Sequence, residues 1–360
     1  MYSFEPNEEQ QMLIDSVSRY AKGDLRPIAR EAEESKSLPQ KLIRKGWELG
    51  VLQASTPEAY GGFGERSAVT GVLAADAMAW GDLAGTLAVM TPGLFTLPIL
   101  LAGSEEQKKQ WVEPVVAADW QPFSAALIES SFDFDPNQLK TTAAADADGY
   151  TLNGVKTMVP FAENAEALIV YANLEGATKG FIVPKNTPGL VVSAREKLMG
   201  LNALPLYRLS LEGVKVPQSN LLAGDFAPVL AAMRVANAAL ALGVAQGALE
   251  YARDYAKERQ AFGVKIAQKQ AIAFMLAEMA TEIEAMRLLT WEAAWMMDAG
   301  KEDAFNQAYL AATGAADMAM MVTDRAVQIL GGHGYIREYP VEMWMRNGRG
   351  FATFTGLAIV

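Results

Sequence analysis

The sequence is most informative at residues 228–259, which read PVLAAMRVANAALALGVAQGALEYARDYAKER. Apolar residues recur in this run at helical spacing, which predicts one long amphipathic helix. Further helical patterns follow at 267–298, 302–330 and 341–353. Long helices with extended apolar stripes favour a four-helix bundle, and stripes of this length also indicate packing between subunits.

The spacing of the apolar residues is different in the preceding part of the chain. Residues from about 121 to 222 form short apolar or alternating runs punctuated by Pro and Gly, which predict a small antiparallel β domain. Asn153-Gly154 lies between two such runs and is a turn signal. Residues 7 to about 118 show helical spacing again, with Asn7-Glu-Glu-Gln10 as a capping box and Ser104 as an N-cap.

The order helical, β, helical predicts an α+β protein of three domains. We expect an N-terminal all-α domain at residues 1–120, a middle β domain at 121–222 and a C-terminal helical bundle at 223–360. A chain of 360 residues is long enough to bury a large core.

Composition argues against several kinds of site. The chain has no cysteine, which excludes disulfides, thiolate nucleophiles and Cys-ligated metals, and its one histidine, His333, argues against a multi-histidine metal site. A formal net charge of −11 argues against a nucleic-acid partner. The N-terminal residues lack the pattern of a signal peptide, and Pro and Gly interrupt the apolar stretches, so we expect no membrane span and a cytoplasmic location.

Short motifs then occur along almost the whole chain, and together they resemble the signatures of the acyl-CoA dehydrogenase family. They are Pro57-Glu-Ala-Tyr-Gly-Gly-Phe-Gly64, Gly103-Ser-Glu-Glu-Gln-Lys108, Asn153-Gly-Val-Lys156, Val214-Lys-Val-Pro217, Glu258-Arg-Gln-Ala-Phe-Gly263 and Gln328-Ile-Leu-Gly-Gly-His-Gly-Tyr335. Glu338-Tyr-Pro340 and Arg346 follow the last of them. The resemblance implies the acyl-CoA dehydrogenase fold, an assembly of two or four subunits, and FAD as cofactor.

The resemblance also implies a reaction and its partners. In the family, a carboxylate base removes the α proton of an acyl-CoA thioester while the β hydride passes to the flavin. An electron-transfer flavoprotein is the expected electron acceptor. The acyl group is open, and straight-chain, cyclic, aromatic and steroid-derived thioesters all fit.

Both positions at which the family places its glutamate base hold other residues in this chain. Counting from Arg346, the segment Phe354-Thr-Gly-Leu357 matches the element that usually carries the base, and Thr355 takes the place of the glutamate. The alternative position, just before Arg234 on the first long C-terminal helix, is Met233. A hydroxyl is too weak a base for this proton. Arg234 itself is a candidate for the acyl-CoA cleft or for an interhelical ion pair.

Several residues that the family directs toward its own flavin ring and substrate are also different. Ile128 lacks the hydroxyl expected near the flavin pyrimidine ring, and Phe134 replaces a serine that contacts the CoA portion. Met158 replaces the aromatic ring that covers the isoalloxazine. Pro160 replaces a threonine near flavin N5 and has neither a hydroxyl nor an N–H. The resemblance therefore predicts that the chain has lost its own flavin-ring site.

A second set of residues is retained. In the family, the ADP half of each FAD is held by the neighbouring subunit, and the matching residues here are Arg259, Phe262, Gln328, Gly331 and Gly332. An arginine can pair with a diphosphate as a fixed fork, and glycines let the backbone approach a phosphate. The alternatives are a solvated Arg259, a Gln328 that caps the core, and a Gly331-Gly332 pair that only breaks a helix.

The asymmetry favours a non-catalytic subunit of a heteromeric acyl-CoA dehydrogenase, for example a heterotetramer that degrades a fatty acid or a related acid. FAD would be shared with a related subunit that carries the glutamate. One alternative is a flavoenzyme that needs no glutamate base, such as a reductase or desulfinase-like enzyme. Another is a non-enzymatic acyl-CoA-binding homologue. A different base is also open, among Glu129, Asp133 and Asp135.

Overall fold

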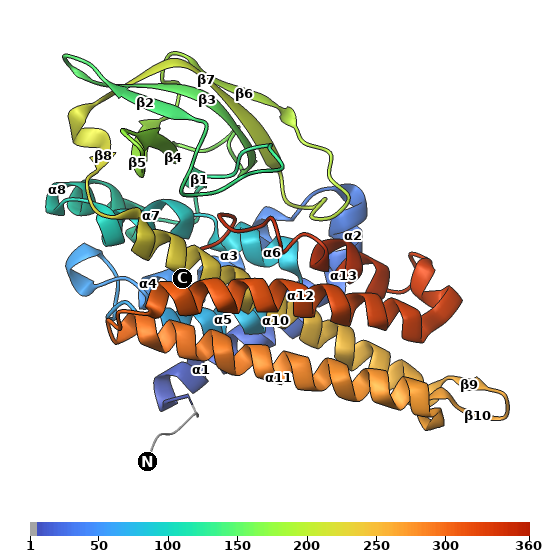
Figure 1. The fold of residues 1–360 in the computed structure, drawn as a ribbon. Coiled ribbons are helices and arrows are strands. Elements are labelled where there is room, and N and C mark those ends of the chain that lie inside the picture. The colour runs from blue at the N-terminus through green and yellow to red at the C-terminus, as the bar shows by residue number, and fades with distance from the viewer. Residues whose placement is uncertain (1–5) are drawn as a thin grey trace.

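The fold was analysed in a computed structural model, which describes residues 6–360. A β domain lies on one side of two helical regions, and the helical regions pack against each other (Figure 1). The α+β prediction with a helical, a β and a second helical domain is confirmed. The capping boxes at Asn7 and Ser104 are both present, with each cap side chain accepting from the N3 backbone N–H.

The N-terminal region consists of short helices, most of which are separated by glycine, proline or a π-helical turn. Ala21–Leu25 is a π-turn between the first two helices, and Lys108–Val112 is another between the last two. The α-helices are α1 (Glu8–Tyr20), α2 (Arg26–Ser35), α3 (Gln40–Trp47), α4 (Val51–Ala54), α5 (Ala68–Ala79), α6 (Leu83–Met90), α7 (Gly93–Ala102), α8 (Glu105–Gln107) and α9 (Glu113–Ala117).

The β domain is one sheet in the order β6-β7-β3-β2-β4-β5-β8, with β1 beside β4. Its strands are β1 (Ser124–Ala126), β2 (Thr142–Ala145), β3 (Gly149–Pro160), β4 (Ala167–Leu174), β5 (Ala177–Pro184), β6 (Leu190–Arg195), β7 (Leu206–Pro217) and β8 (Leu221–Leu222). The prediction of an antiparallel domain is confirmed for most pairings and wrong for two, because β1 and β2 both pair with β4 in parallel. Neither of these strands is joined to β4 by a hairpin, so no local turn sets their direction.

The predicted turn at Asn153-Gly154 is also wrong. Both residues lie inside β3, where the pairing with β7 shifts register between Leu152 and Gly154. Gly154 has φ 150°, and a Cβ there would lie 2.5 Å from Thr141 Oγ1. The glycine therefore marks a β-bulge with a close neighbour, which is the other common role of a glycine within a strand.

The C-terminal region contains three long helices, α10 (Phe226–Glu258), α11 (Gln270–Asp298) and α12 (Ala304–Leu330). A small hairpin of β9 (Gln260–Ala261) and β10 (Val264–Lys265) separates the first two, and α13 (Val341–Gly348) follows the third. The last helix ends before the predicted residue 353. Gly348 fits closely against Thr323, where a Cβ would lie 2.6 Å from Oγ1, and the chain then turns so that Phe351 and Phe354 pack edge to face.

Helix α10 is the centre of the molecule. It contacts α5, α11, α12 and α13, so the bundle is completed by an N-terminal helix. Its small residues allow a close approach, because a Cβ on Gly243 would lie 2.3 Å from the Asp76 carbonyl oxygen. By length and composition α10 could cross a membrane, but 83% of its most apolar window is buried inside the protein, as in a core helix.

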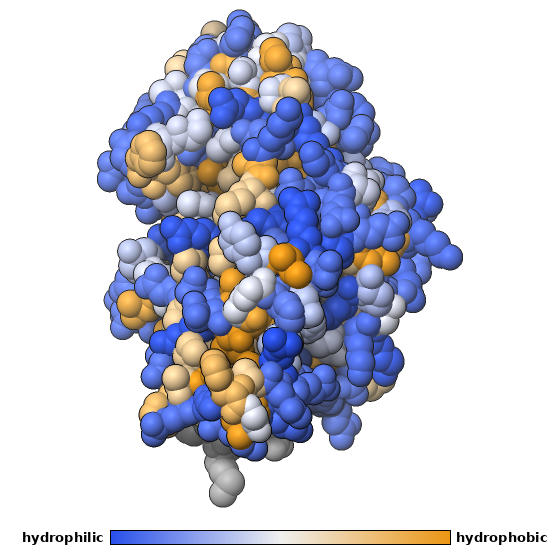
Figure 2. Space-filling view, turned by 90° about the vertical axis from the view of Figure 1, so that its right-hand side faces the viewer, coloured by the Kyte–Doolittle hydropathy of each residue, from blue (hydrophilic) through white to orange (hydrophobic). Residues whose placement is uncertain are grey.

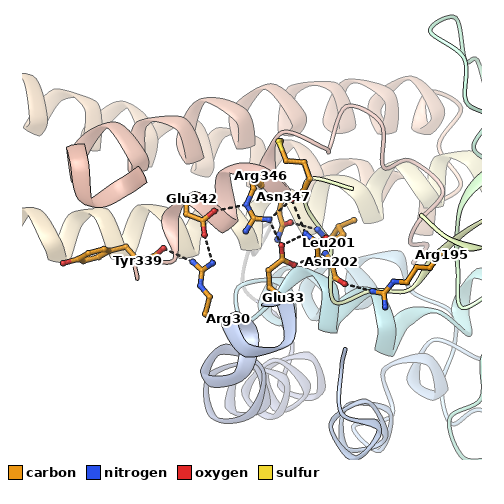
Figure 3. A network of polar contacts seen from close by, with 10 residues as sticks. Arg30, Glu33, Arg195, Leu201, Asn202, Tyr339, Glu342, Arg346 and Asn347 are labelled. Atoms are coloured by element: carbon orange, nitrogen blue, oxygen red, sulfur yellow. Dashed lines mark hydrogen bonds and ion pairs between the residues drawn. The ribbon is translucent and has the colours of Figure 1, made fainter. Parts of the chain in front are cut away.

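A buried polar network joins the three domains (Figure 3). Arg346 of α13 donates to Glu33 of α2, to Glu342 at 2.8 Å and to the Met199 carbonyl oxygen at 2.6 Å. Glu33 also accepts from the backbone and side-chain nitrogens of Asn202, at 2.9 and 2.7 Å. One arginine therefore links the N-terminal domain, the loop after β6 and the last helix.

Removing Arg346 should destabilise the protein strongly. Arg346→Met leaves Glu33 buried without its counter-charge and Glu342 paired with Arg30 alone, and we expect the free energy of unfolding in urea to fall by about 3 kcal/mol. Lys185→Met breaks the exposed pair with Glu166 and serves as the control, with an expected loss below about 1 kcal/mol. Equal losses for the two variants would contradict this account of the network.

Candidate functional site

The structure brings the C-terminal segment onto the β domain at the predicted catalytic position. Thr355 is half-buried, and the next residue, Gly356, lies against the end of β1. A Cβ on Gly356 would lie 3.1 Å from Leu127 Cδ2 and 3.5 Å from Ile128 Cγ1. The two chain segments that the sequence assigned to one site are therefore neighbours, although the segment carries a hydroxyl and no carboxylate.

Met233, at the second predicted base position, is fully buried in the core. It packs in an apolar cluster with residues of α7, the β domain and the C-terminal segment, including Phe95, Ile169 and Ile359. Neither position thus offers an acid.

The region where a flavin ring would contact this chain is filled by side chains. Ile128 is 6% exposed and packs in the main core with Trp120 and Phe161, whose rings meet edge to face at 5.2 Å. Pro160 is buried and pairs with Leu206 of β7. Ile128, Met158 and Pro160 do not line the cavities described here, but a cavity of about 260 Å³ borders their neighbours Glu196 and Leu206.

The backbone at Met158 is already engaged. Met158 has φ 55°, and its N–H donates to Glu196 Oε2 at 2.8 Å. The Thr157 hydroxyl donates to the same carboxylate at 2.6 Å. These donors satisfy a half-buried acid of this chain and are not free for a ligand. The side chains of Ile128, Met158 and Pro160 offer no hydrogen-bond donor to an isoalloxazine ring, and the Met158 N–H is already bonded to Glu196.

The residue at the predicted CoA contact is also apolar where the family has a polar one. Phe134, in place of the expected serine, is half-buried and packs against both large apolar clusters. Arg234 stacks over the Tyr309 ring, with its guanidinium carbon 4.9 Å from the ring centroid. This contact accounts for Arg234 without a substrate and without an ion pair.

The other acids near Ile128 have structural partners. Glu129 accepts from buried Lys156 Nζ at 2.8 Å and from the N–H groups of Lys140 and Thr141 at 2.8 and 2.9 Å. Burial opposes ionisation, but the Lys156 ammonium and these donors hold the pKa of Glu129 below its usual value. Asp133 pairs with Lys140, and this hydrogen bond lowers its pKa as well. Carboxylates held in this way are poor bases.

A different pocket opens at the far end of the bundle. It has a volume of about 290 Å³ and is lined by Tyr255, Arg259, Ile266, Ile329, Leu330, Gly331, Gly332 and His333. Arg259 begins the turn after α10, and Gly331 ends α12 with φ 59°. Figure 2 views the molecule from this end and shows apolar residues gathered over its helical half, below the β domain.

Three of the five predicted cofactor-binding residues therefore line one pocket. They are Arg259, Gly331 and Gly332. Phe262 lies in the hairpin beside the pocket and is 95% exposed, and Gln328 is exposed on α12, but neither lines the pocket. Single exposed apolar residues are common on protein surfaces, and Lys269 Nζ lies 5.8 Å from the centroid of the Phe262 ring.

The pocket contains two residues that the sequence did not single out as ligands. Tyr255 lies one helical turn before Arg259, and a hydrogen bond of 2.7 Å joins its hydroxyl to His333 Nδ1. The His333 ring also stacks on Tyr339 at 4.9 Å. The four-residue spacing of Tyr255 and Arg259 was the available signal, since residues four apart share a helix face.

The pocket fits the diphosphate half of a nucleotide. The Arg259 side chain has no hydrogen bond or ion pair with any residue from 6 to 360, so its guanidinium is free to bind an anion. Added Cβ atoms on Gly331 and Gly332 would meet nothing within 4 Å, so their backbone is open to an approaching group.

The three-domain architecture of helices, a β sheet and helices is that of a class of flavin-dependent oxidoreductases. Family models described as the N-terminal, middle and C-terminal domains of acyl-CoA dehydrogenase match residues 7–119, 124–214 and 227–358. The chain belongs to the acyl-CoA dehydrogenase family.

Relatives of known activity are similar over nearly the whole chain. The mitochondrial short-chain specific acyl-CoA dehydrogenase of Homo sapiens is 34% identical, over 96% of this chain and 86% of that protein. The 3-(aryl)acrylate reductase of Clostridium sporogenes is 34% identical, over 98% and 96%. Butyryl-CoA dehydrogenase from Megasphaera elsdenii has a TM-score of 0.89 at 32% identity, over 99% and 96% of the two chains. A chain in a structure described as the electron transferring flavoprotein of Acidaminococcus fermentans has a TM-score of 0.89 at 34% identity, with the same coverage.

Truncating Ile128 should test whether its side chain is core or cofactor-facing. In the structure Ile128 is packed by protein, so Ile128→Ala should leave a cavity and lower the free energy of unfolding by about 3 kcal/mol. Ile336→Ala, at a site that is 39% exposed, is the control and should cost less than about 1 kcal/mol. Denaturant unfolding of the purified chain measures both. A loss at Ile128 as small as at Ile336 would mean that Ile128 borders open space.

Proposed function

We propose that this chain is a non-catalytic subunit of a heteromeric FAD-dependent acyl-CoA dehydrogenase. It would complete the FAD site of a related subunit that carries the glutamate base. The observation that carries the proposal is the contrast between the two half-sites. The side chains of Ile128, Met158 and Pro160 are buried or half-buried and offer no hydrogen-bond donor, whereas the pocket at Arg259 has a cation without a partner among the described residues.

In this assembly the chain's contribution is binding and orientation. FAD, when bound, supplies the hydride acceptor for α,β-desaturation of an acyl-CoA thioester. The Arg259 guanidinium would hold the diphosphate of the partner's FAD, with two N–H groups directed at phosphate oxygens. The open backbone at Gly331 and Gly332 would lie against the same group. Arg259 neutralises charge there without taking part in proton transfer.

The chain's own acyl-CoA site has no group for the chemical step. Thr355 stands at the base position, and a neutral hydroxyl does not remove an α proton of a thioester at useful rates. Phe134 packs where the CoA portion would bind. Substrate binding and desaturation are therefore assigned to the partner subunit, and electron transfer to an electron-transfer flavoprotein follows from the family. A cytoplasmic location belongs to the same proposal.

A flavoenzyme that acts without a glutamate base is the second candidate. The 34% identity to a 3-(aryl)acrylate reductase favours it, because reduction of an activated double bond is the reverse type of chemistry in the same family. The filled region at Ile128 argues against it, since such an enzyme needs its own flavin ring. An acyl-CoA-binding protein without FAD is disfavoured by the free Arg259.

The first test compares the flavin content of the chain alone with that of the complex. The chain should be colourless when purified alone and should form a complex with a glutamate-bearing paralogue that holds one FAD for each pair of chains. Arg259→Ala should lower the affinity of the complex for FAD by roughly 10-fold to 100-fold, because a charge-assisted bond to phosphate is lost. Absorbance during dilution or ultrafiltration measures the loss.

Arg253→Ala is the matched control for this experiment. Arg253 lies on the same helix, is exposed and pairs only with Asp254, so FAD affinity should not change. One FAD bound by each copy of the chain alone would refute the partner-subunit proposal and favour the reductase reading.

Restoring the acid alone should not restore catalysis. Thr355→Glu places a carboxylate next to Gly356, which lies against Leu127 and Ile128, but the chain lacks the polar groups that would hold a flavin ring, so the variant chain should show no acyl-CoA dehydrogenase activity. The complex containing Thr355→Glu should keep the kcat of the unmodified complex. Dye-linked oxidation of short, branched and aromatic acyl-CoA thioesters is the assay. A gain of activity in the chain alone would show a functional flavin site in this chain.

A further inference from the structure

A second cavity, which the proposed function does not use, lies where the β domain meets the N-terminal domain. It has a volume of about 260 Å³. Lys36 at the end of α2 lines it, together with residues of the segment 195–206, which joins β6 to β7. None of the residues assigned to FAD lines this cavity. Boundaries between domains are common places for small-molecule sites.

The cavity has more cations than acids. Lys36, Arg195 and Lys197 line it, and none of the three has an ion pair with a described residue. Its one carboxylate, Glu196, already accepts hydrogen bonds from β3 and pairs with Arg208 at 3.5 Å. The chain as a whole has a formal net charge of −11, so a site with three unpaired cations is a local reversal of sign. Such a site attracts anions.

Hydrogen bonds hold the walls of the cavity in place. Arg195 donates to the Lys36 carbonyl oxygen at 2.7 Å and to the Asn202 carbonyl oxygen, so it ties the end of α2 to the loop after β6 (Figure 3). On the same loop, the Leu201 N–H donates to the Asn347 side chain of α13 at 3.0 Å. A site that is already ordered loses little conformational entropy when a ligand binds.

Unusual backbone conformations gather at the same place. Seven non-glycine residues of 6–360 have positive φ. Two of them, Lys36 at 57° and Leu201 at 54°, line the cavity, and a third, Met158 at 55°, donates to Glu196 of its wall. Side chains other than glycine, asparagine and aspartate rarely adopt this conformation. Residues held in it by their surroundings are concentrated at ligand sites.

We propose that this cavity binds a small organic monoanion, a carboxylate attached to a short apolar body. The ammonium groups of Lys36 and Lys197 bind the carboxylate, because neither has a partner among the described residues. The apolar body lies against the buried leucines of the cavity, which are Leu201, Leu204 and Leu206. The Arg195 guanidinium adds positive potential from its fixed position. The inference does not depend on the proposed function.

Other ligands fit the cavity less well. An inorganic anion would leave the leucines against water, and a neutral ligand would leave three cations without a counter-charge. A phosphate ester carries nearly two charges at neutral pH and would lie close to the Glu196 carboxylate, whereas a carboxylate carries one. A flavin ring would find no free donor on the neighbouring strand, because the Met158 N–H and the Thr157 hydroxyl both bond to Glu196.

Titration of the full chain with hexanoate, acetate and hexan-1-ol tests the proposal, with binding followed by ligand-observed NMR. At about 50 mM salt, hexanoate should bind at least ~10-fold more tightly than acetate, which lacks the apolar chain, and than hexan-1-ol, which lacks the charge. Raising the salt to about 500 mM should weaken hexanoate binding, because the exposed lysines are screened. Equal affinities for hexanoate and hexan-1-ol, or no binding of hexanoate, would overturn the proposal.

Variants of the lining residues locate the binding site. Lys36→Met combined with Lys197→Met keeps the apolar stems and removes both charges, so hexanoate affinity should fall by roughly 10-fold. Leu198→Trp should fill the cavity from a half-buried position and abolish binding. Lys109→Met combined with Lys215→Met is the matched control, since both lysines are exposed and neither lines the cavity. An equal loss of affinity in this control would place the anion elsewhere.

Competition with riboflavin separates this cavity from a flavin site. Hexanoate should stay bound when riboflavin is added, and the chain should remain colourless. Displacement of hexanoate by riboflavin would show that the cavity takes a flavin ring, which contradicts the proposal. The FAD content of the complex with the glutamate-bearing subunit is measured separately, so failure of the carboxylate site and failure of the shared FAD site give different results.

Discussion

Arg346 makes the contacts that position the segment carrying Thr355 against the segment carrying Ile128. Its guanidinium joins Glu33 of the N-terminal domain to the Met199 carbonyl of the β-domain loop, and it does so from α13. The segment that carries Thr355 begins directly after α13, so fixing this helix fixes where the segment meets Ile128. Glu33 of the same cluster also accepts a hydrogen bond from the Asn202 N–H. Shortly after Asn202, the Pro205 carbonyl oxygen accepts a hydrogen bond from the Phe161 N–H. A buried charge with several partners is rigid, because any displacement leaves an unpaired ion.

The sequence predicted the fold well where periodicity carries the information. The three long C-terminal helices lie within a few residues of their predicted bounds, since their apolar stripes extend over many turns. The prediction from the sequence was wrong where one residue type is common in two kinds of local structure. Asn153-Gly154 has the composition of a hairpin turn, but Gly154 serves the close approach of Thr141 in a bulge. The parallel pairings of β1 and β2 with β4 come from long connections, which leave no local pattern.

The sequence predicted individual residues of the candidate site but not which residues lie together in space. Motif spacing located Thr355, Met233 and Arg259, and the structure adds what surrounds each of them. Motif spacing could not show that Gly356 lies against Leu127, because that contact joins distant segments of the chain. It also missed Tyr255 and His333, whose link closes one side of the outer pocket. Such groupings depend on the ends of two helices meeting in space, and no short pattern encodes that.

The different fates of the two half-sites have a common physical cause. A pocket inside one chain that loses its polar groups becomes apolar, and apolar interiors close to high packing density, as at Ile128 and Phe134. A half-site at the surface cannot close in that way, because the missing wall belongs to another molecule. Openness at Arg259 alone is therefore weak evidence for a ligand. The stronger evidence is the unpaired guanidinium, because a glycine of positive φ such as Gly331 is a common end of a helix without any ligand.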